Sequence, residues 1–218
     1  MARQLRGAAG LWKVGSQLFT SEGPRAVEKL AGLGASIFLD LKFHDIPNTV
    51  AGAVAAAADL PSVRMLTLHT TGGLAMMRAA REAMAGKKRR PALLGVTILT
   101  SLDAPALRVV GISGSVASRA VALARLAKQA GLDGVVTSIH EARAIRRACG
   151  PQFLIVIPGV RPHNASQQDQ SRVATPADAI CAGADYLVVG RPITGAQSPR
   201  NAALSIAEEI ADASRVTR

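Results

Sequence analysis

Short apolar runs alternate with longer amphipathic segments along the whole sequence. The runs at 153–157 and 186–189 are almost continuously apolar, which is typical of parallel strands buried on both faces. We predict strands at 11–15, 36–42, 65–69, 93–99, 134–137, 153–157 and 186–189. We predict helices at 23–33, 47–58, 72–85, 116–131, 140–149, 176–182 and 199–213. Each predicted strand is followed by a helix, and this alternation indicates β/α units around a parallel sheet.

Seven such units come close to the eight of a (β/α)8 TIM barrel, and a doubly wound open sheet is the main alternative. The open sheet typically carries a GxGxxG turn after its first strand, and the sequence contains no such run. We therefore expect an α/β protein with the TIM barrel fold. The chain has 218 residues and no linker or low-complexity tract, so residues 1–218 are expected to form one barrel domain.

Composition narrows the functional classes. Aromatic residues make up only 3% of the chain, which disfavours recognition of nucleic acid by stacking. The net charge of +11 is concentrated in the middle of the chain, and its densest run, at 87–90, is expected to be a solvated loop. Cys149 and Cys181 form neither a disulfide framework nor a CxxC pair, and no apolar stretch is long enough to span a membrane. We expect a reduced, cytoplasmic protein that binds neither nucleic acid nor membrane.

Polar residues just after the strands are the first candidates for chemistry, because barrels carry their sites on the loops that leave the carboxyl ends of the strands. Asp40 and Lys42 lie at the end of the second predicted strand, Asp45 follows it, and Lys13 lies in the first. Residues two apart on a strand face the same way, so Asp40 and Lys42 should both point into the barrel mouth. Opposite charges keep each other ionised there. A structural ion-pair network is the alternative, and the DxKxxD spacing alone does not decide between the two.

A phosphate site is predicted after the last two strands, where barrels commonly build one. Arg161 closes a Pro-Gly-Val-Arg run after the sixth strand, and Gly190 and Arg191 follow the seventh. Backbone N–H groups at a helix start, together with an arginine fork, suit a phosphate dianion. Gln170 lies in a polar loop, 164–172, that is long enough to fold over such a ligand.

These runs, in this order, resemble the orotidine 5′-phosphate decarboxylase family. The resemblance rests on Lys-Val-Gly at 13–15, the run Phe-Leu-Asp-Leu-Lys-Phe-His-Asp-Ile-Pro-Asn-Thr at 38–49, and the segments at 94–101, 158–162, 169–170 and 189–194. It covers the chain from about residue 11 to the C-terminus. It implies a TIM barrel of the ribulose-phosphate-binding type that decarboxylates orotidine 5′-phosphate to uridine 5′-phosphate in de novo pyrimidine biosynthesis. No cofactor and no metal are implied.

The resemblance also implies a role for each matching residue. Lys42 would protonate C6 as carbon dioxide leaves, and Asp40 would face the carboxylate of the substrate. Lys13 would contact Asp40 and the ribose, Thr100 would lie near the pyrimidine, and Asp45 would reach the neighbouring subunit's site in a homodimer. The substrate-binding set so implied is Lys13, Asp40, Leu41, Lys42, Phe43, His44, Asp45, Ile46, Pro47, Asn48, Thr49, Thr100, Arg161, Gln170, Gly190 and Arg191, in which Asp45 and Thr49 act across the subunit interface and the last four hold phosphate.

The N-terminus departs from the family pattern. The family normally begins with a strand that carries a ribose-binding aspartate, but the twelve residues before Lys13 contain no aspartate and no apolar strand. We expect the barrel to lack its first β/α unit, with part of that unit's helix kept at 2–9 and two unpaired strand edges. An upstream start, a degraded copy and a gap filled by another segment stay open. A truncated, inactive nucleotide-binding remnant is therefore the alternative function, and a metal-dependent sugar-phosphate barrel sharing DxKxxD is a third.

Overall fold

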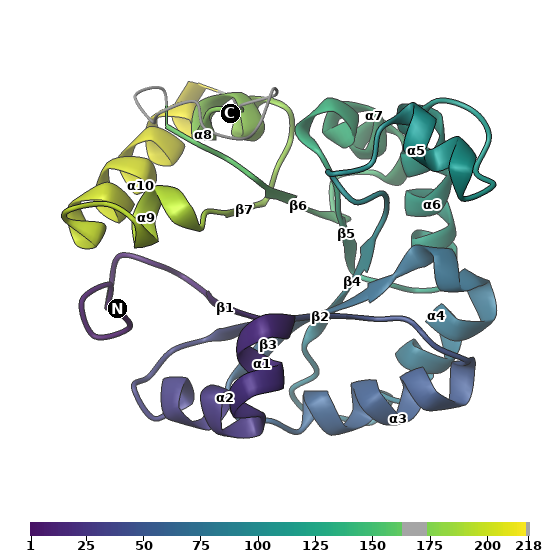
Figure 1. The fold of residues 1–218 in the computed structure, drawn as a ribbon, viewed down its shortest axis with the longest axis horizontal. Helices are drawn as coiled ribbons and strands as arrows, with labels where there is room; N and C mark the ends of the chain where they lie inside the picture. Colours follow the sequence, from purple (N-terminus) through teal and green to yellow (C-terminus); the bar gives the residue numbers. More distant parts are fainter. Residues whose placement is uncertain (163–173, 217–218) are drawn as a thin grey trace.

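A computed structural model describes residues 1–162 and 174–216 (Figure 1). The described residues form seven parallel strands in one curved sheet. The strands are β1 (Trp12–Gly15), β2 (Ile37–Phe43), β3 (Val63–His69), β4 (Ala92–Val96), β5 (Gly134–Val136), β6 (Leu154–Pro158) and β7 (Tyr186–Val188). Each strand pairs with the next along the chain. All seven predicted strands are confirmed, and the uninterrupted strand order is that of a nearly closed TIM barrel, so the doubly wound alternative is wrong.

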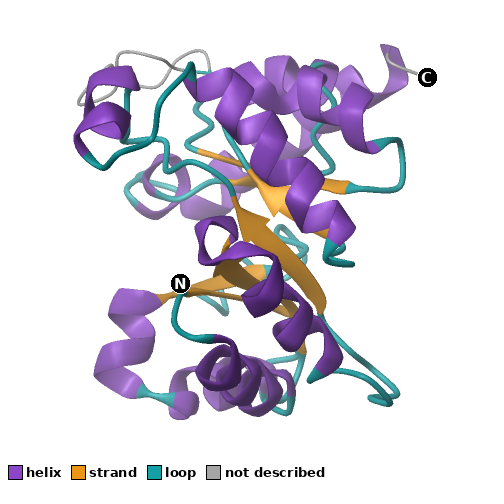
Figure 2. Ribbon diagram, turned by 90° about the vertical axis from the view of Figure 1, so that its right-hand side faces the viewer, coloured by secondary structure: helices purple, strands orange, loops and turns teal. Residues whose placement is uncertain are grey.

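Helices surround this sheet on the outside, as Figure 2 shows from the side. They are α1 (Ser16–Glu22), α2 (Pro24–Ala31), α3 (Pro47–Ala58), α4 (Gly73–Glu82), α5 (Ala104–Val109), α6 (Val116–Gln129), α7 (Ile139–Cys149), α8 (Pro176–Cys181), α9 (Arg191–Thr194) and α10 (Pro199–Val216), with a 3-10 turn η1 (Thr70–Gly72) before α4. The seven predicted helices are confirmed. The short helices α1, α5 and α9 were not predicted, because segments of four to seven residues show too little periodicity.

Two apolar clusters hold the barrel together. The larger lies between the sheet and the helices and includes fully buried residues such as Leu39, Leu66 and Ile155. The smaller cluster contains Phe38, Met65, Leu94, Val96, Val136 and Val156. Because side chains alternate along a strand, these two clusters occupy opposite faces of the sheet, the outer face and the barrel interior.

The sheet has two edges, β1 and β7, and no ladder joins them within the described residues. Residues 2–8 form turns, so the prediction of a residual helix there is wrong. These turns pack on α10 instead, where Arg200 Nη1 donates to the carbonyl oxygens of Gln4 and Arg6 at 3.1 and 2.8 Å (Figure 1). Leu5 is buried beneath them. The N-terminal segment thus spans the space between β1 and the last helix without adding a strand.

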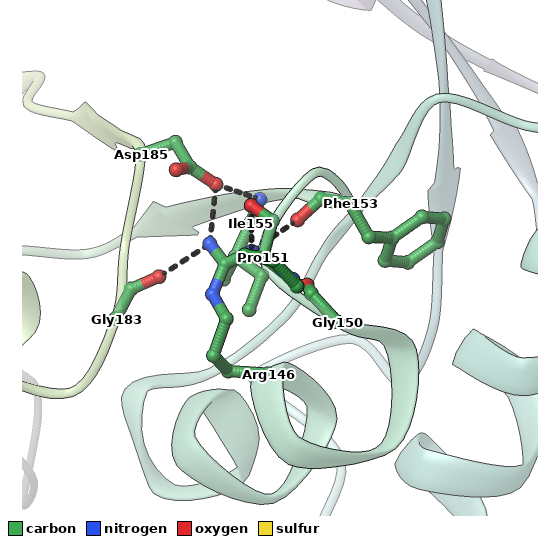
Figure 3. A network of polar contacts seen from close by, with 7 residues as sticks. All are labelled: Arg146, Gly150, Pro151, Phe153, Ile155, Gly183 and Asp185. Carbon is green, nitrogen blue, oxygen red and sulfur yellow. Dashed lines mark hydrogen bonds and ion pairs between the residues drawn. The ribbon is translucent and has the colours of Figure 1, made fainter.

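Arg146, on α7, contacts the segment before β6 and the segment before β7, at the amino-terminal end of the strands (Figure 3). Its Nη1 atom donates to three backbone carbonyl oxygens at 2.7–3.0 Å, those of Gly150, Pro151 and Phe153. Its Nη2 atom donates to Gly183 O at 2.8 Å and to Asp185 Oδ2 at 2.6 Å. The same carboxylate oxygen accepts from Ile155 N at 2.7 Å. One arginine and one aspartate therefore fix the entry of the chain into both β6 and β7.

The basic run at 87–90 lies in the loop between α4 and β4, as predicted. Lys87 forms an ion pair with Asp59, and Arg90 forms one with Asp133. Two of the four cations thus have carboxylate partners, which favours a structural role for the run. In the described part of the chain, no helix combines the length and the apolar character needed to cross a bilayer.

Candidate active site

A cavity of about 250 Å3 opens at the carboxyl ends of the strands. Three charged side chains line it, those of Lys13, Asp40 and Lys42. Its other lining residues are Phe38, Val96, Ile98, Leu99, Thr100, Val136, Thr137, Pro158 and Val188. The predicted site therefore coincides with this cavity, and Thr100 is one of its lining residues. The cavity combines three charged side chains with a mainly apolar lining.

Asp40 is the centre of the charged group. Asp40 exposes only 8% of its surface, and each of its carboxylate oxygens lies 2.8 Å from Lys42 Nζ. Lys13 Nζ lies 3.6 Å from Asp40 Oδ2. The two lysine side chains keep 39% and 32% of their surface, so one buried carboxylate holds two ammonium groups that still face the cavity.

The β2 strand is not regular where these side chains leave it. Leu39 and Phe43 pair with β3 residues that are only two apart, so three residues of β2 face the single residue Thr67. Lys42, within this bulge, has a backbone φ of +51°. Asp40 and Lys42 do share the cavity as predicted, but a bulge re-aims Lys42, and regular strand alternation is not the reason.

The loop after β2 turns away from the cavity. All residues from His44 to Thr49 are exposed, and Ile46 keeps 66% of its surface. Asp45 Oδ1 accepts a 2.6 Å hydrogen bond from Ile46 N, and Pro47 begins α3. The predicted residues Asp45, Ile46, Pro47, Asn48 and Thr49 therefore form an exposed edge beside the site, whereas Leu41 and Phe43 pack against the main core.

The predicted phosphate residues follow β6 and β7. Arg161 is buried, and its backbone N donates to Ala174 O at 3.0 Å. Gly190 immediately precedes α9, and Arg191 is the first residue of that helix. Gln170 and the loop 164–172 lie outside the described residues, so the predicted fold of this loop over a ligand stays a prediction.

Thr67 is a site residue that the sequence reasoning missed. It is fully buried in β3, and its Oγ1 lies 3.0 Å from Asp40 Oδ1 and 2.9 Å from Lys42 N. The available signal was a polar residue inside an otherwise apolar stretch, two positions before His69 at the strand end. Without the bulge in β2, nothing in that pattern places the hydroxyl against Asp40.

A sequence model of the orotidine 5′-phosphate decarboxylase / HUMPS family matches residues 1–206, which is nearly the whole chain. The chain belongs to this family. The family match confirms the resemblance found in the sequence motifs. The strand order agrees with it, because it is that of a TIM barrel.

Named members of the family are close in sequence and in fold. The orotidine 5′-phosphate decarboxylase of Nitrosococcus oceani is 51% identical over 212 residues, which cover 97% of this chain and 91% of that protein. The orotidine 5′-phosphate decarboxylase of Syntrophotalea carbinolica is 54% identical over 97% of this chain and 88% of its own length. The crystal structure of the orotidine 5′-phosphate decarboxylase from Lactobacillus acidophilus superposes with a TM-score of 0.80 at 39% identity, covering 91% of this chain and 85% of the other.

In this decarboxylase-family chain, two histidines lie beside the charged group. The rings of His44 and His69 are 5.4 Å apart between centroids and tilted by 41°. Burial lowers the pKa of His69 below 6.5, and the nearby His44 and Lys42 lower it further, while Asp40 opposes the shift. Within the described residues, no three His, Cys, Asp or Glu side chains gather into a group that could hold a metal ion.

Proposed function

We propose that this protein converts orotidine 5′-phosphate to uridine 5′-phosphate, without a cofactor or metal, in de novo pyrimidine biosynthesis. The observation that carries the proposal is the Lys13–Asp40–Lys42 group at the cavity, with Lys42 Nζ 2.8 Å from both oxygens of Asp40. Membership of the family and about 50% identity to named decarboxylases over more than nine-tenths of the chain support it.

Lys42 would supply the chemistry that this reaction needs. When the bond between C6 and the carboxylate carbon breaks, carbon dioxide leaves and the electron pair stays on C6. A fixed ammonium group stabilises that developing negative charge and then transfers a proton to it. Lys42 Nζ is held by Asp40 but remains open to the cavity, so it can serve as both the stabilising charge and the proton donor.

Asp40 would face the carboxylate of the substrate, and repulsion between the two is only part of the catalysis. At 4 Å and an effective dielectric constant near 20, such repulsion is worth about 4 kcal/mol. Enzymes typically lower their barriers by about 8–23 kcal/mol. Most of the acceleration must therefore come from the preorganised charge at Lys42 and from binding energy at the rest of the substrate.

Binding energy would come from the phosphate end of the nucleotide. We assign that end to Arg161, Gly190 and Arg191, with Gln170 as the fourth member of the set. The ribose would lie at Lys13 and the pyrimidine near Thr100. The volume of the cavity, about 250 Å3, suits the base and sugar of one mononucleotide.

The exposed edge after β2 supports a homodimer with shared active sites. Ile46 exposes a large apolar side chain there, and Asp45 and Thr49 lie beside it. In the proposed dimer these two polar residues act in the site of the neighbouring subunit, and His44, Pro47 and Asn48 belong to the same edge. We place the enzyme in the cytoplasm, where free thiols such as those of Cys149 and Cys181 stay reduced.

Replacement of Lys42 tests the assignment. We expect Lys42→Ala to abolish release of carbon dioxide from orotidine 5′-phosphate while binding of uridine 5′-phosphate stays measurable by calorimetry. Near-normal turnover in the purified Lys42→Ala protein would overturn the mechanism. If the unaltered chain binds the product nucleotide but releases no carbon dioxide, it is the inactive remnant. Loss of turnover on chelation, restored by magnesium, would point to the metal-dependent sugar-phosphate barrel.

A further inference from the structure

Thr67 links the two central residues of the site through one hydroxyl group. Lys42 N donates to Thr67 Oγ1 at 2.9 Å, and Thr67 Oγ1 donates to Asp40 Oδ1 at 3.0 Å. A threonine hydroxyl has a single proton, and a carboxylate can only accept. The proton is therefore directed to Asp40, and a lone pair of the same oxygen receives the Lys42 N–H. Because Thr67 is fully buried, water does not compete for either bond.

The backbone of Lys42 needs this contact. Its φ of +51° lies in the left-handed region, which residues with a side chain rarely adopt. Such a conformation persists where the surrounding contacts fix it. The bulge displaces Lys42 from the regular pairing of β2 with β3, and Thr67 Oγ1 takes the place of a carbonyl acceptor. Removal of the hydroxyl would leave a part-buried N–H without its partner and release the constraint on φ.

We propose that Thr67 is a positioning residue for the decarboxylation, setting Lys42 and Asp40 at once. The proposal rests on the function proposed above. A change of φ at Lys42 would swing its side chain, so that Nζ would leave its place 2.8 Å from both oxygens of Asp40. The bond from Thr67 to Asp40 Oδ1 fixes the carboxylate at the same time. An ammonium group that is already oriented needs no rearrangement when charge develops at C6, so the contribution of Thr67 falls on kcat.

Thr67→Val tests this proposal, because valine keeps the shape of threonine and removes the hydroxyl. We expect kcat to fall on the order of 10- to 100-fold. The KM for orotidine 5′-phosphate should change less than about threefold, since the residues assigned to phosphate follow β6 and β7, away from Thr67 in β3. Thr67→Ser keeps the hydroxyl and should restore most of the lost kcat.

Thr70→Val is the matched control. Thr70 is also fully buried, but its Oγ1 donates to the backbone carbonyl Val96 O at 2.9 Å rather than to Asp40. We expect its kcat to stay within about twofold of the unaltered protein even if its melting temperature falls by as much as that of Thr67→Val. Loss of kcat in Thr67→Val alone would separate positioning from general stability.

The remaining outcomes are equally decisive. If Thr67→Val does not fold, Thr67→Ser and Thr67→Ala answer the same question, because both lack the methyl group and differ only in the hydroxyl. Equal kcat in that pair, or unchanged kcat in a folded Thr67→Val, would overturn the proposal. An unaltered chain that releases no carbon dioxide would instead overturn the proposed function, before any variant is measured, and the role of Thr67 would fall with it.

Discussion

Arg90 and Asp133 form a two-pronged ion pair at the amino-terminal end of the barrel, with Nη1–Oδ2 and Nη2–Oδ1 distances of 2.7 and 2.8 Å. Asp133 Oδ2 also accepts from Leu93 N at 2.8 Å, so the aspartate before β5 fixes the start of β4. Asp185, before β7, accepts from Ile155 N of β6 in the same way. The barrel thus repeats one device, an aspartate that joins two neighbouring strands and is held by an arginine.

Asp133→Asn should weaken the fold. Burial alone would raise the pKa of Asp133, but the hydrogen bonds from Arg90 and Leu93, together with the positive charges of Arg90 and Arg81, outweigh it and lower the pKa below 3.8. The charged form is therefore favoured in the folded state, and its stabilisation is present above pH 3.8 and lost as the pH falls through the lowered pKa. We expect the substitution to reduce the free energy of unfolding at neutral pH by about 1–3 kcal/mol, measured by urea denaturation.

Asp212→Asn provides the control for that measurement. Asp212 pairs with Arg215 at 3.1 Å, but their side chains are 75% and 80% exposed. Exposed pairs contribute little to stability, so the midpoint of unfolding should hardly move. An Asp133→Asn protein as stable as Asp212→Asn would show that the repeated aspartate device does not hold the strands.

The order of elements was predictable because it depends on local patterns. Continuous apolar runs marked the strands, and the charged residues within the first two of them, Lys13, Asp40 and Lys42, meet at one cavity because parallel strands end at the same side. The bulge was not predictable. It depends on the pairing of β2 with β3, where Thr67 meets residues 40–42 across 25 to 27 positions of chain.

Contacts between segments far apart in the sequence could not be predicted for the same reason. Arg146 and Asp185 are 39 positions apart, and Arg200 contacts Gln4 across 196. No spacing rule connects such residues, because their proximity results from the packing of segments around the curved sheet. The turns at 2–8 were mistaken for a helical remnant, since a short alanine-containing segment carries no periodicity that distinguishes a helix from a turn.

Gly134→Ala should disrupt the β5–β6 pair. A Cβ atom at this position would collide with Leu154 O and would lie 2.8 Å from the carbonyl carbon of the same residue. It would also lie 2.5 Å from Leu154 Cβ, and none of these three atoms can move without the backbone of the paired strand, so relief requires the two strands to separate. We expect a loss of about 1–3 kcal/mol in the free energy of unfolding, again measured by urea denaturation.

Gly10→Ala is the corresponding control, because a Cβ atom there meets no other atom within 4 Å. Its free energy of unfolding should change by no more than about 0.5 kcal/mol. Equal stabilities of the Gly134→Ala and Gly10→Ala proteins would mean that β5 and β6 can move apart without cost, contrary to the tight ladder.

His69→Gln should reduce the sensitivity of the protein to acid. Burial, His44 and Lys42 lower the pKa of His69 below 6.5, so the unfolded chain binds a proton at a higher pH than the folded chain. The contribution of neutral His69 to the free energy of unfolding is therefore fully present above pH 6.5, and it is lost as the pH drops toward the lowered pKa. Between neutral pH and about pH 5, the melting temperature of His69→Gln should fall less than that of the unaltered protein.

Parallel melting curves for His69→Gln and the unaltered protein at every pH would show that the proton affinity of His69 is the same in the folded and unfolded chain.

Mixed dimers should recover activity if the exposed edge after β2 completes a neighbouring site. Lys42→Ala and Asp45→Ala are each expected to be inactive, but a dimer with one chain of each has one site with both residues intact. Equal amounts, unfolded together and refolded, should regain up to about a quarter of normal activity, because half of the dimers are mixed and each has one working site. Turnover and sedimentation of the refolded mixture provide the two measurements.

The pair Lys42→Ala and Asp40→Ala is the matched control for the mixed dimers. Asp40 contacts Lys42 within one chain, so every mixed dimer of this pair lacks a residue in both of its sites. It should regain no activity. Recovery with Asp45→Ala and none with Asp40→Ala would place Asp45 in the site of the partner, because the two pairs differ only in which carboxylate is removed. Failure of both pairs, with dimers present in the sedimentation profile, would instead confine the catalytic set to a single chain.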